Sequence, residues 1–283
     1  MRGVVIVGAT AAAAGAVALA PRARGATWEE WFTEFAWSSL VVPSGPLGWV
    51  SSHWLMPRFH GPMYPPMAEA LDLRPEDELL EVACGSGMFL AHHAAHVGFV
   101  AGLDLSDLQI DLARRQLAER IASGTAEIVH GDAAELPWTD ARFSAVTCMG
   151  SMEAFPDPPR ALTEMLRVLR PGGRAALGMG FRLPEGTETH QEMGGTWVWS
   201  EADARRLVEE AGFVHVSVSY AALSGDGRLD RALDRLVKSE DMRIVRGTKE
   251  GKVTSPERER LLQQPPTAGW TQPSPASGGR GGR

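Results

Sequence analysis

The residues best suited to ligand chemistry lie in a short glycine-rich stretch and at two acidic positions beyond it. Gly85 and Gly87 flank Ser86, and glycine lets the backbone turn tightly and approach a ligand without a Cβ in the way. Asp104 follows roughly 20 residues after the first glycine, where an acid can accept both hydroxyls of a ribose. Asp132 follows a further apolar run, where an acid can accept an amino proton of adenine. The spacing therefore predicts a site for an adenosine-like ligand.

Glu81, just before the glycine-rich stretch, indicates which kind of ligand suits this loop. A dinucleotide fingerprint cradles a pyrophosphate and needs a third glycine near position 90, where this chain has Leu90. A carboxylate beside the loop disfavours phosphate and favours an ammonium group. The free N–H groups at the start of the next helix suit a carboxylate. Ammonium and carboxylate at one end, ribose in the middle and adenine at the other end describe S-adenosyl-L-methionine.

Alternating strands and helices must bring these positions together. Apolar runs predict strands at 78–82, 99–105, 126–130, 145–149, 174–179, 215–220 and 242–246. Helical spacing predicts helices at 87–97, 106–121, 158–169 and 200–211. This alternation is typical of an α/β fold, with a mostly parallel sheet and helices on both faces. Ligands bind beyond the carboxyl ends of such strands, so we expect the chemistry after the first four strands.

The composition is that of a globular protein. The 283 residues carry a net charge of −7, with 35 acidic against 28 basic side chains, which argues against a dedicated nucleic-acid binder. Two cysteines exclude a disulfide scaffold and favour a reducing compartment. We expect an apolar N-terminal segment at 1–25, an aromatic-rich cap at 26–66 and one folded domain at 67–248. A disordered tail rich in Gly and Pro follows at 249–283.

The apolar run from Val4 to Ala20 has three interpretations. It is a membrane anchor, a signal peptide with the small-residue pattern Ala18-Leu19-Ala20, or the result of a start codon placed too early. Pro21, directly after the cleavage pattern, argues against cleavage. We expect a cytoplasmic protein, with membrane association on the cytoplasmic side through residues 4–20 as the alternative.

Five stretches in order resemble the motifs of the class I S-adenosylmethionine-dependent methyltransferases. The likeness runs from about residue 40 to residue 247 and is closest to the subgroup that methylates small molecules such as quinones, lipids and natural products. The stretches are Leu79 to Gly87, Gly102 to Ser106, Gly131 to Pro137, Leu166 to Arg174 and Ala211 to Phe213.

The resemblance implies a Rossmann-like sheet of seven mostly parallel strands, the seventh antiparallel, and a role for each matching position. Gly85, Ser86 and Gly87 would hold the methionine part of S-adenosylmethionine, with Glu81 near its amino group. The other implied contacts are Asp104 with the ribose, Leu105 packed on the adenine, Asp132 and Ala133 at the adenine edge, and Met149 lining the cofactor in place of the usual polar residue.

Two segments outside the sheet are candidates for the side that binds the methyl acceptor. Residues 27–66 hold five of the nine Trp residues and begin with a helix-capping pattern at Thr27, which suits either a lid over an apolar acceptor or a helix packed on the domain. The second segment, 181–199, is a long connection after the fifth predicted strand. We therefore predict a small, apolar acceptor.

Methyl transfer needs a general base only when the acceptor must lose a proton. No single catalytic side chain is predicted, and His53, His60, Tyr64 and Glu153 are the candidate bases. His92 and His96 have metal-ligand spacing but no third ligand, so no metal is predicted. Two alternatives stay open. One is a non-catalytic or membrane-tethered binding protein on the same fold. The other is an aminopropyl transferase, which would require further acidic residues after the fourth predicted strand, where the sequence has only Glu153.

Overall fold

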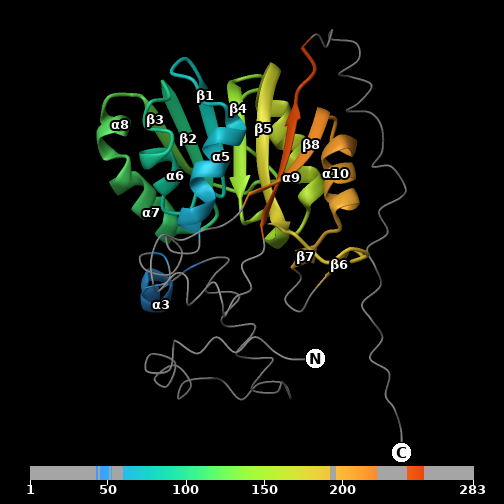
Figure 1. Ribbon diagram of the computed structural model, residues 1–283. Helices are drawn as coiled ribbons and strands as arrows, with labels where there is room; N and C mark the ends of the chain where they lie inside the picture. Colours follow the sequence, from blue (N-terminus) through green and yellow to red (C-terminus); the bar gives the residue numbers. More distant parts are fainter. Residues whose placement is uncertain are drawn as a thin grey trace, which may run out of the picture.

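A computed structural model of the chain describes residues 43, 45–50, 52, 60–191, 196–221 and 241–251. Their main feature is a seven-stranded sheet in the order β3-β2-β1-β4-β5-β9-β8 (Figure 1). The five strands from β1 to β5 are parallel to one another, whereas β9 is antiparallel to both β5 and β8. The predicted fold class, with its antiparallel last strand, is confirmed.

The strands of this sheet follow the apolar runs of the sequence closely. They are β1 Glu78–Val82, β2 Phe99–Asp104, β3 Ala126–His130, β4 Phe143–Met149, β5 Leu169–Phe181, β8 Val214–Ala221 and β9 Met242–Thr248. A separate two-stranded ribbon joins β6 His190–Gln191 to β7 Trp197–Val198. β5 is longer than predicted at both ends, because Leu169 already pairs with Phe143 of β4 and Phe181 still pairs with Met242 of β9, each across a register shift.

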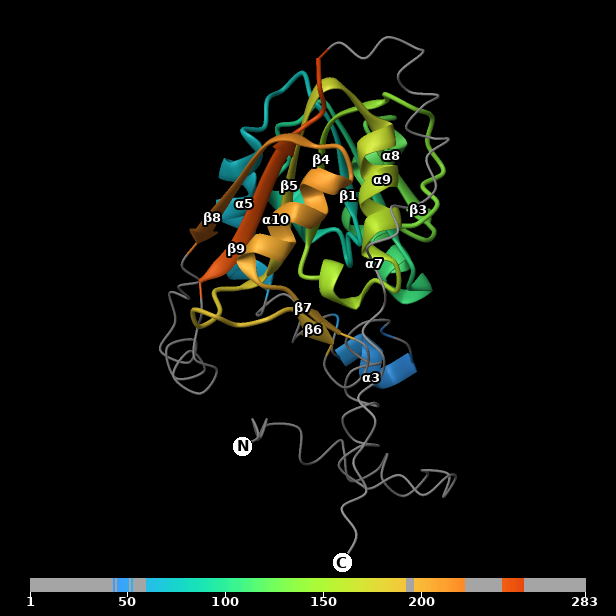
Figure 2. The ribbon, with the colours of Figure 1, turned by 90° about the vertical axis from the view of Figure 1, so that its right-hand side faces the viewer.

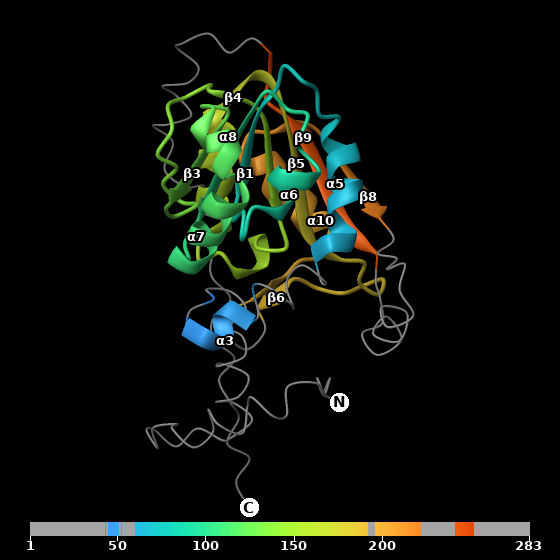
Figure 3. The ribbon, with the colours of Figure 1, turned by 90° about the vertical axis from the view of Figure 1, so that its left-hand side faces the viewer.

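Helices cover both faces of the sheet. On one face, α9 (Pro158–Val168) and α10 (Glu201–Glu210) pack into the apolar cluster that contains Leu80 (Figure 2). On the other face, α5 (Tyr64–Leu71), α6 (Met88–His92) and α7 (Asp107–Gln116) pack into the cluster that contains Leu79 (Figure 3). Neighbouring residues of one strand point to opposite faces, so β1 contributes to both clusters.

Short polar side chains cap the starts of three helices. Ser106 accepts a hydrogen bond from the backbone N–H of Gln109, and Ser200 accepts one from that of Asp203 at 3.1 Å. Asp157 caps α9 in the same way, directly before Pro158 at the first helical position. The capped α7 starts where β2 ends, which fixes the loop between them.

The helix predicted over 106–121 is divided, which differs from the sequence prediction. α7 ends at Gln116, and the short α8 (Ala118–Ala122) continues in another direction from the buried Leu117. The guanidinium of Arg120 donates to the carbonyl oxygens of Ala94 and Val97, which ties α8 to the loop before β2. Such long-range contacts have no local sequence signal. α6 is likewise shorter than the predicted helix at 87–97.

Two short elements and one helix lie at the carboxyl edge of the sheet, outside its layers. They are α3 (Gly45–Val50), the 3₁₀ turn η2 (Gly61–Met63) and the 3₁₀ turn η3 (Met152–Ala154). α3 lies beyond the strand ends (Figure 3). The hydroxyl of Ser106 donates to the carbonyl of Pro43 at 2.7 Å, so chain just before α3 contacts the end of β2.

Candidate functional site

The loop between β1 and α6 is shaped by left-handed backbone conformations. Ala83, Gly85 and Gly87 have φ values of 57°, 52° and 75°. At Gly87 the close approach of α7 adds a second constraint, because a Cβ there would lie 3.1 Å from the Cβ of Ala113. Glycine at this position therefore serves both the turn and the packing of α6 on α7.

Asp104 at the end of β2 ties two loops together. Its Oδ2 accepts a hydrogen bond from the backbone N–H of Gly85 at 2.9 Å, and its Oδ1 accepts one from that of Ser106 at 2.9 Å. Burial raises the pKa of Asp104, although the backbone N–H bonds favour its ionised form. Each oxygen keeps a further lone pair, so the side chain can still accept hydroxyl groups of a ligand.

Glu81 lies beside Asp104 and is only 3% exposed. Its Oε2 is buried and has no hydrogen-bond partner among the described residues. Burial, and then the negative charge of Asp104, raise the pKa of Glu81 well above its ordinary value. A buried acid without a partner is costly for the protein alone, and a positively charged ligand would relieve that cost.

The ends of β2 and β3 carry the residues predicted to contact adenine. Leu105 is 53% exposed at the end of β2, while Ala133 after β3 is buried. The carboxylate of Asp132 is exposed and accepts a hydrogen bond from the backbone N–H of Ala134 at 2.8 Å. The backbone N–H of Gly131 donates to the carbonyl of Asp104 at 3.0 Å, which joins the two strand ends. Sequence positions far apart thus lie on one edge.

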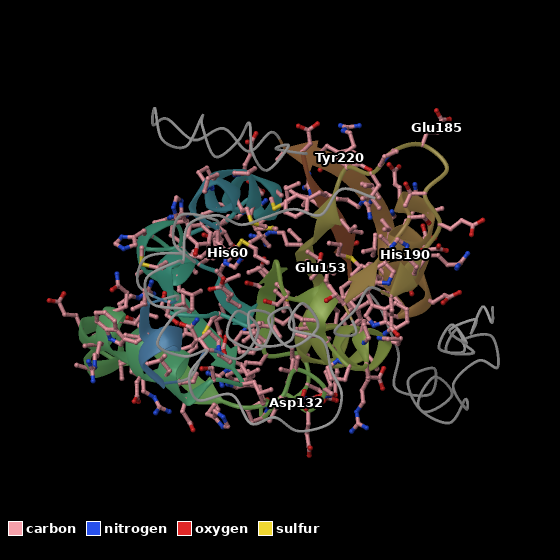
Figure 4. All side chains as sticks on the ribbon, turned by 90° about the horizontal axis from the view of Figure 1, so that it is seen from below. His60, Asp132, Glu153, Glu185, His190 and Tyr220 are labelled. Carbon is pink, nitrogen blue, oxygen red and sulfur yellow. The ribbon has the colours of Figure 1, made fainter. Side chains whose placement is uncertain are left out.

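The end of β4 and the turn after it combine a buried apolar side chain, Met149, with an acidic one, Glu153. Met149 is buried, and Gly150 follows with a φ of 62°. The ring of His60 covers this glycine, since a Cβ on Gly150 would lie 3.1 Å from its Nε2. Glu153 in η3 lies near the middle of the same edge (Figure 4). The predicted cofactor positions therefore all lie along the carboxyl edge of the sheet.

The chain after β5 places two aromatic rings in the apolar cluster that contains Leu80. Trp197 and Trp199 are buried and stacked, with ring centroids 6.3 Å apart and planes 7° apart. The buried guanidinium of Arg243 in β9 donates to the carbonyl oxygens of Trp199 at 2.9 Å and Phe181 at 3.1 Å. The predicted acceptor segment 181–199 is therefore anchored to the sheet by an arginine that sequence analysis did not identify.

The four candidate bases differ in environment. Tyr64 packs against the rings of Phe89 and His93, and burial raises its pKa far above the ordinary value. Burial lowers the pKa of His60, which stays neutral. Burial raises the pKa of Glu153 to about 7. His53 lies outside the described residues, as do most of the Trp residues in 27–66.

Gln109 is a residue that sequence analysis missed. It is buried in the first turn of α7, and its Oε1 has no hydrogen-bond partner among the described residues. Its Nε2 lies 3.9 Å from where a Cβ on Gly85 would stand. Only its place three residues after the helix-capping Ser106 could have drawn attention to it. Gln109 therefore adds a polar group beneath the glycine-rich loop.

His92 and His96, the two histidines with metal-ligand spacing, each lie within hydrogen-bond distance of another residue of the chain. The Nε2 atom of His92 lies 2.9 Å from the side-chain nitrogen of Gln116, and that of His96 lies 3.3 Å from the carbonyl of Leu73. Across the described ranges no three His, Cys, Asp or Glu side chains form a group that could hold a metal. Within the same ranges no helix is both long and apolar enough to cross a bilayer.

Known sequences resemble the part of the chain that forms this edge. Residues 80–177 match the family model described as "Methyltransferase domain". The chain is 38% identical over 104 residues to a demethylmenaquinone methyltransferase of Symbiobacterium thermophilum, which covers 36% of this chain and 41% of the relative. It is 35% identical over 119 residues to a 27-O-demethylrifamycin SV methyltransferase of Amycolatopsis mediterranei, which covers 42% and 44%. The match spans less than half the length of these curated relatives.

A solved structure resembles the fold over a larger part of the chain. It is the geranyl diphosphate C-methyltransferase from Streptomyces coelicolor, in complex with Mg²⁺, geranyl diphosphate and S-adenosyl-L-homocysteine. The similarity has a TM-score of 0.54 at 16% identity and covers 75% of this chain and 85% of that one. At this identity the likeness shows that the two chains share a fold.

Proposed function

We propose that this chain, which contains a class I S-adenosylmethionine-dependent methyltransferase domain, transfers a methyl group from S-adenosylmethionine to a small, apolar molecule. The observation that carries the proposal is the pair of buried acids at the first two strand ends. Asp104 is held by the amide of Gly85, and Glu81 beside it has a buried carboxylate oxygen with no partner in the described part of the chain. This pair suits a ligand with both hydroxyl groups and a positive charge.

The residues of the edge fit the parts of S-adenosylmethionine in order. Glu81 would hold its ammonium group, Gly85, Ser86 and Gly87 its methionine part, and Asp104 its ribose. Leu105, Asp132, Ala133 and Met149 would surround the adenine and line the rest of the cofactor. When bound, the cofactor supplies a methyl group on a positively charged sulfur, which is already activated for displacement. What remains for the protein is to align the acceptor and to exclude water.

The apolar character of the acceptor is supported by the surroundings of the β4 end. Met149 and Met152 are buried there, and Trp197 and Trp199 lie in the chain after β5. The curated relatives are named for demethylmenaquinone and demethylrifamycin, both small molecules. We propose a lipid, quinone or natural product as the acceptor, with residues 26–66 and 181–199 on its side of the site.

Calorimetric titration of the full chain with S-adenosylmethionine tests the first part of the proposal. We expect binding with one site per chain, and competition by S-adenosylhomocysteine. A pure, folded protein that binds neither compound would contradict the proposal. Incubation with methyl-labelled S-adenosylmethionine and extracts of the source cells then identifies the acceptor as the labelled product.

The location and segment boundaries belong to the same proposal. We place the protein in the cytoplasm, with residues 4–20 as a membrane contact and residues 249–283 as a tail, and most of these residues lie outside the described ones. The boundary expected between residues 66 and 67 lies inside α5. Cell fractionation of the full chain and of a chain lacking residues 2–25 tests the membrane contact: only the full chain should sediment with membranes.

A further inference from the structure

Glu153 lies at the carboxyl edge of the sheet, directly after β4. It lies in η3, two residues beyond the turn at Gly150 that ends β4. Figure 4 shows it near the middle of the carboxyl edge, between His60 on one side and His190 on the other. Its Oε1 lies 3.4 Å from where a Cβ on Gly180 would stand, so the carboxyl group lies against the exit of β5. Of the cofactor residues proposed above, all but Met149 lie at β1, β2 and β3, so we place the acceptor beside the chain that follows β4 and β5.

No ion pair accounts for this carboxylate. Its Oε1 is enclosed and has no hydrogen-bond partner of normal geometry, and the side chain forms no ion pair within 4.0 Å in the described ranges. The buried cation that acts on it is Arg243, whose guanidinium is directed at the carbonyl oxygens of Trp199 and Phe181. An enclosed carboxylate without an ion-pair partner is costly for stability, which favours a role toward a ligand over a role in the fold.

The surroundings of Glu153 shift its pKa toward neutral pH. Burial raises its pKa to about 7, while the backbone amides of Glu153 and Gly180 and the positive charge of Arg243 act in the opposite direction. The other ionisable group coupled to it is Cys148 at the end of β4, a buried thiol whose own pKa is raised. A carboxyl group with this pKa is about half ionised at pH 7, which is the condition that suits a general base.

The other two described candidates suit this task less well. Burial makes the ionised form of Tyr64 unfavourable, so it cannot serve as a phenolate near neutral pH. Burial also disfavours the protonated form of His60, which weakens it as a proton acceptor. In Glu153 the same physical effect has the opposite sign, since burial there favours uptake of a proton.

We propose that Glu153 is the general base of the methyl transfer and that the acceptor carries an ionisable hydroxyl group, as in a phenol, a hydroquinone or an enol. This inference rests on the proposed function. Transfer of the hydroxyl proton to the Glu153 carboxylate leaves the acceptor oxygen with the electron pair that forms the bond to the methyl carbon. The electron pair of the broken carbon–sulfur bond stays on sulfur. The negative charge of Glu153 and the positive charge of the donor are both consumed, so charge is balanced.

The test compares Glu153→Gln with Glu119→Gln in the full chain. Glu119 is exposed on α8, outside both segments proposed for the acceptor side, and the two substitutions make the same chemical change. Infrared difference spectra of each protein with S-adenosylhomocysteine, recorded across pH, follow carboxyl titration without any acceptor. We expect one carboxyl group that titrates near pH 7 in the wild type and in the Glu119 variant, and its loss in Glu153→Gln.

Transfer from methyl-labelled S-adenosylmethionine is then measured with 2-naphthol and 1,4-dihydroxynaphthalene, and with 2-naphthylamine as the matched amine. We expect methylation of the hydroxyl probes only, with a rate that rises with pH around 7. Glu153→Gln should lower that rate by about 10²–10⁴-fold, abolish its pH dependence and leave cofactor affinity within about twofold. Glu119→Gln should behave as the wild type.

Several results would overturn the inference. These are an unchanged carboxyl titration in Glu153→Gln, an unchanged rate in that variant, or transfer to the amine alone. A protein that binds S-adenosylmethionine but methylates neither hydroxyl probe would overturn the acceptor class. A protein that does not bind S-adenosylmethionine would overturn the proposed function instead, so the two failures are distinguishable. Circular dichroism confirms that each variant is folded.

Discussion

The carboxylate of Asp104 accepts a hydrogen bond from the backbone N–H of Gly85 at 2.9 Å, and this contact joins the end of β2 to the glycine-rich loop after β1. The same side chain also accepts the N–H of Ser106, which begins the turn into α7. One buried acid therefore fixes the two loops between which we place the ribose and the methionine part of the cofactor. Loss of its charge should affect both loops.

Asp104→Asn should weaken S-adenosylmethionine binding by at least about tenfold, because a hydrogen bond to a charged group contributes about 1.5–3 kcal/mol. Isothermal titration calorimetry measures the change. Asp111→Asn is the matched control, since Asp111 is exposed on α7, and its affinity should stay within about twofold of the wild type. Equal affinities for the Asp104 variant and the wild type would contradict the ribose assignment.

Cofactor binding should release a proton from Glu81. Burial and then Asp104 raise the pKa of this side chain in the free protein well above its ordinary value, so the free protein keeps this proton to a higher pH than an ordinary glutamate would. A bound ammonium group favours the ionised form, which lowers that pKa. Affinity should therefore rise with pH through the raised pKa of Glu81.

Calorimetry in buffers of different ionisation enthalpy gives the number of protons released per cofactor bound. Glu81→Gln should remove this release and bind more weakly, while Glu135→Gln, at an exposed position of the same edge, should release protons as the wild type does. A wild-type binding enthalpy that does not depend on the buffer would show that Glu81 does not titrate on binding.

Gly87→Ala should destabilise the fold for two separable reasons. The alanine must adopt a φ of 75°, and its Cβ must fit 3.1 Å from that of Ala113. Gly124 has a φ of 74° but open space around the missing Cβ, so Gly124→Ala carries the backbone cost alone. That cost is about 1–2 kcal/mol.

Urea unfolding should therefore show a larger loss for Gly87→Ala than for Gly124→Ala, by about 1 kcal/mol or more for the crowding. Equal losses would mean that α6 can move away from α7 without cost. The Gly87 variant should also bind S-adenosylmethionine more weakly, whereas the Gly124 variant should not.

Most of the fold could be predicted from the sequence, because apolar runs and helical spacing are local signals that recur along the chain. These signals depend on neighbouring residues, and the helices that begin at Asp107, Pro158 and Glu201 start within one residue of their predicted positions. The break at Leu117 was not predicted because it depends on Arg120 and carbonyl groups more than 20 residues away.

The candidate site was predictable in position but not in chemistry. Asp104 and Glu81 could be chosen from their places after apolar runs, because parallel strands end on the same edge. Which of four candidate bases is suited to neutral pH depends on burial, and burial of Glu153 results from packing against β5 and Arg243, far away in the sequence. Gln109 was missed for the same reason.

A partly buried ion pair should contribute to stability at neutral pH and weaken in acid. Asp77 forms an ion pair with Arg174 and accepts hydrogen bonds from the Ser144 hydroxyl at 2.7 Å and the backbone N–H of Arg74 at 2.7 Å. Burial alone would raise the pKa of Asp77, but the contacts with Arg174, Ser144 and Arg74 outweigh it and lower the pKa.

Because the folded pKa of Asp77 lies below the unfolded one, its contribution is fully present above the unfolded value of about 4 and is lost as pH falls through the folded value. Asp77→Asn should therefore lower the free energy of unfolding by about 1–3 kcal/mol at pH 7, and by less near pH 3. Asp72→Asn removes the exposed ion pair with Arg74 and should change the free energy of unfolding far less than Asp77→Asn does. Urea unfolding at pH 7 and pH 3 measures all three proteins. A cost for Asp77→Asn that is the same at both pH values would mean that the Asp77 carboxylate contributes through its shape rather than through its charge.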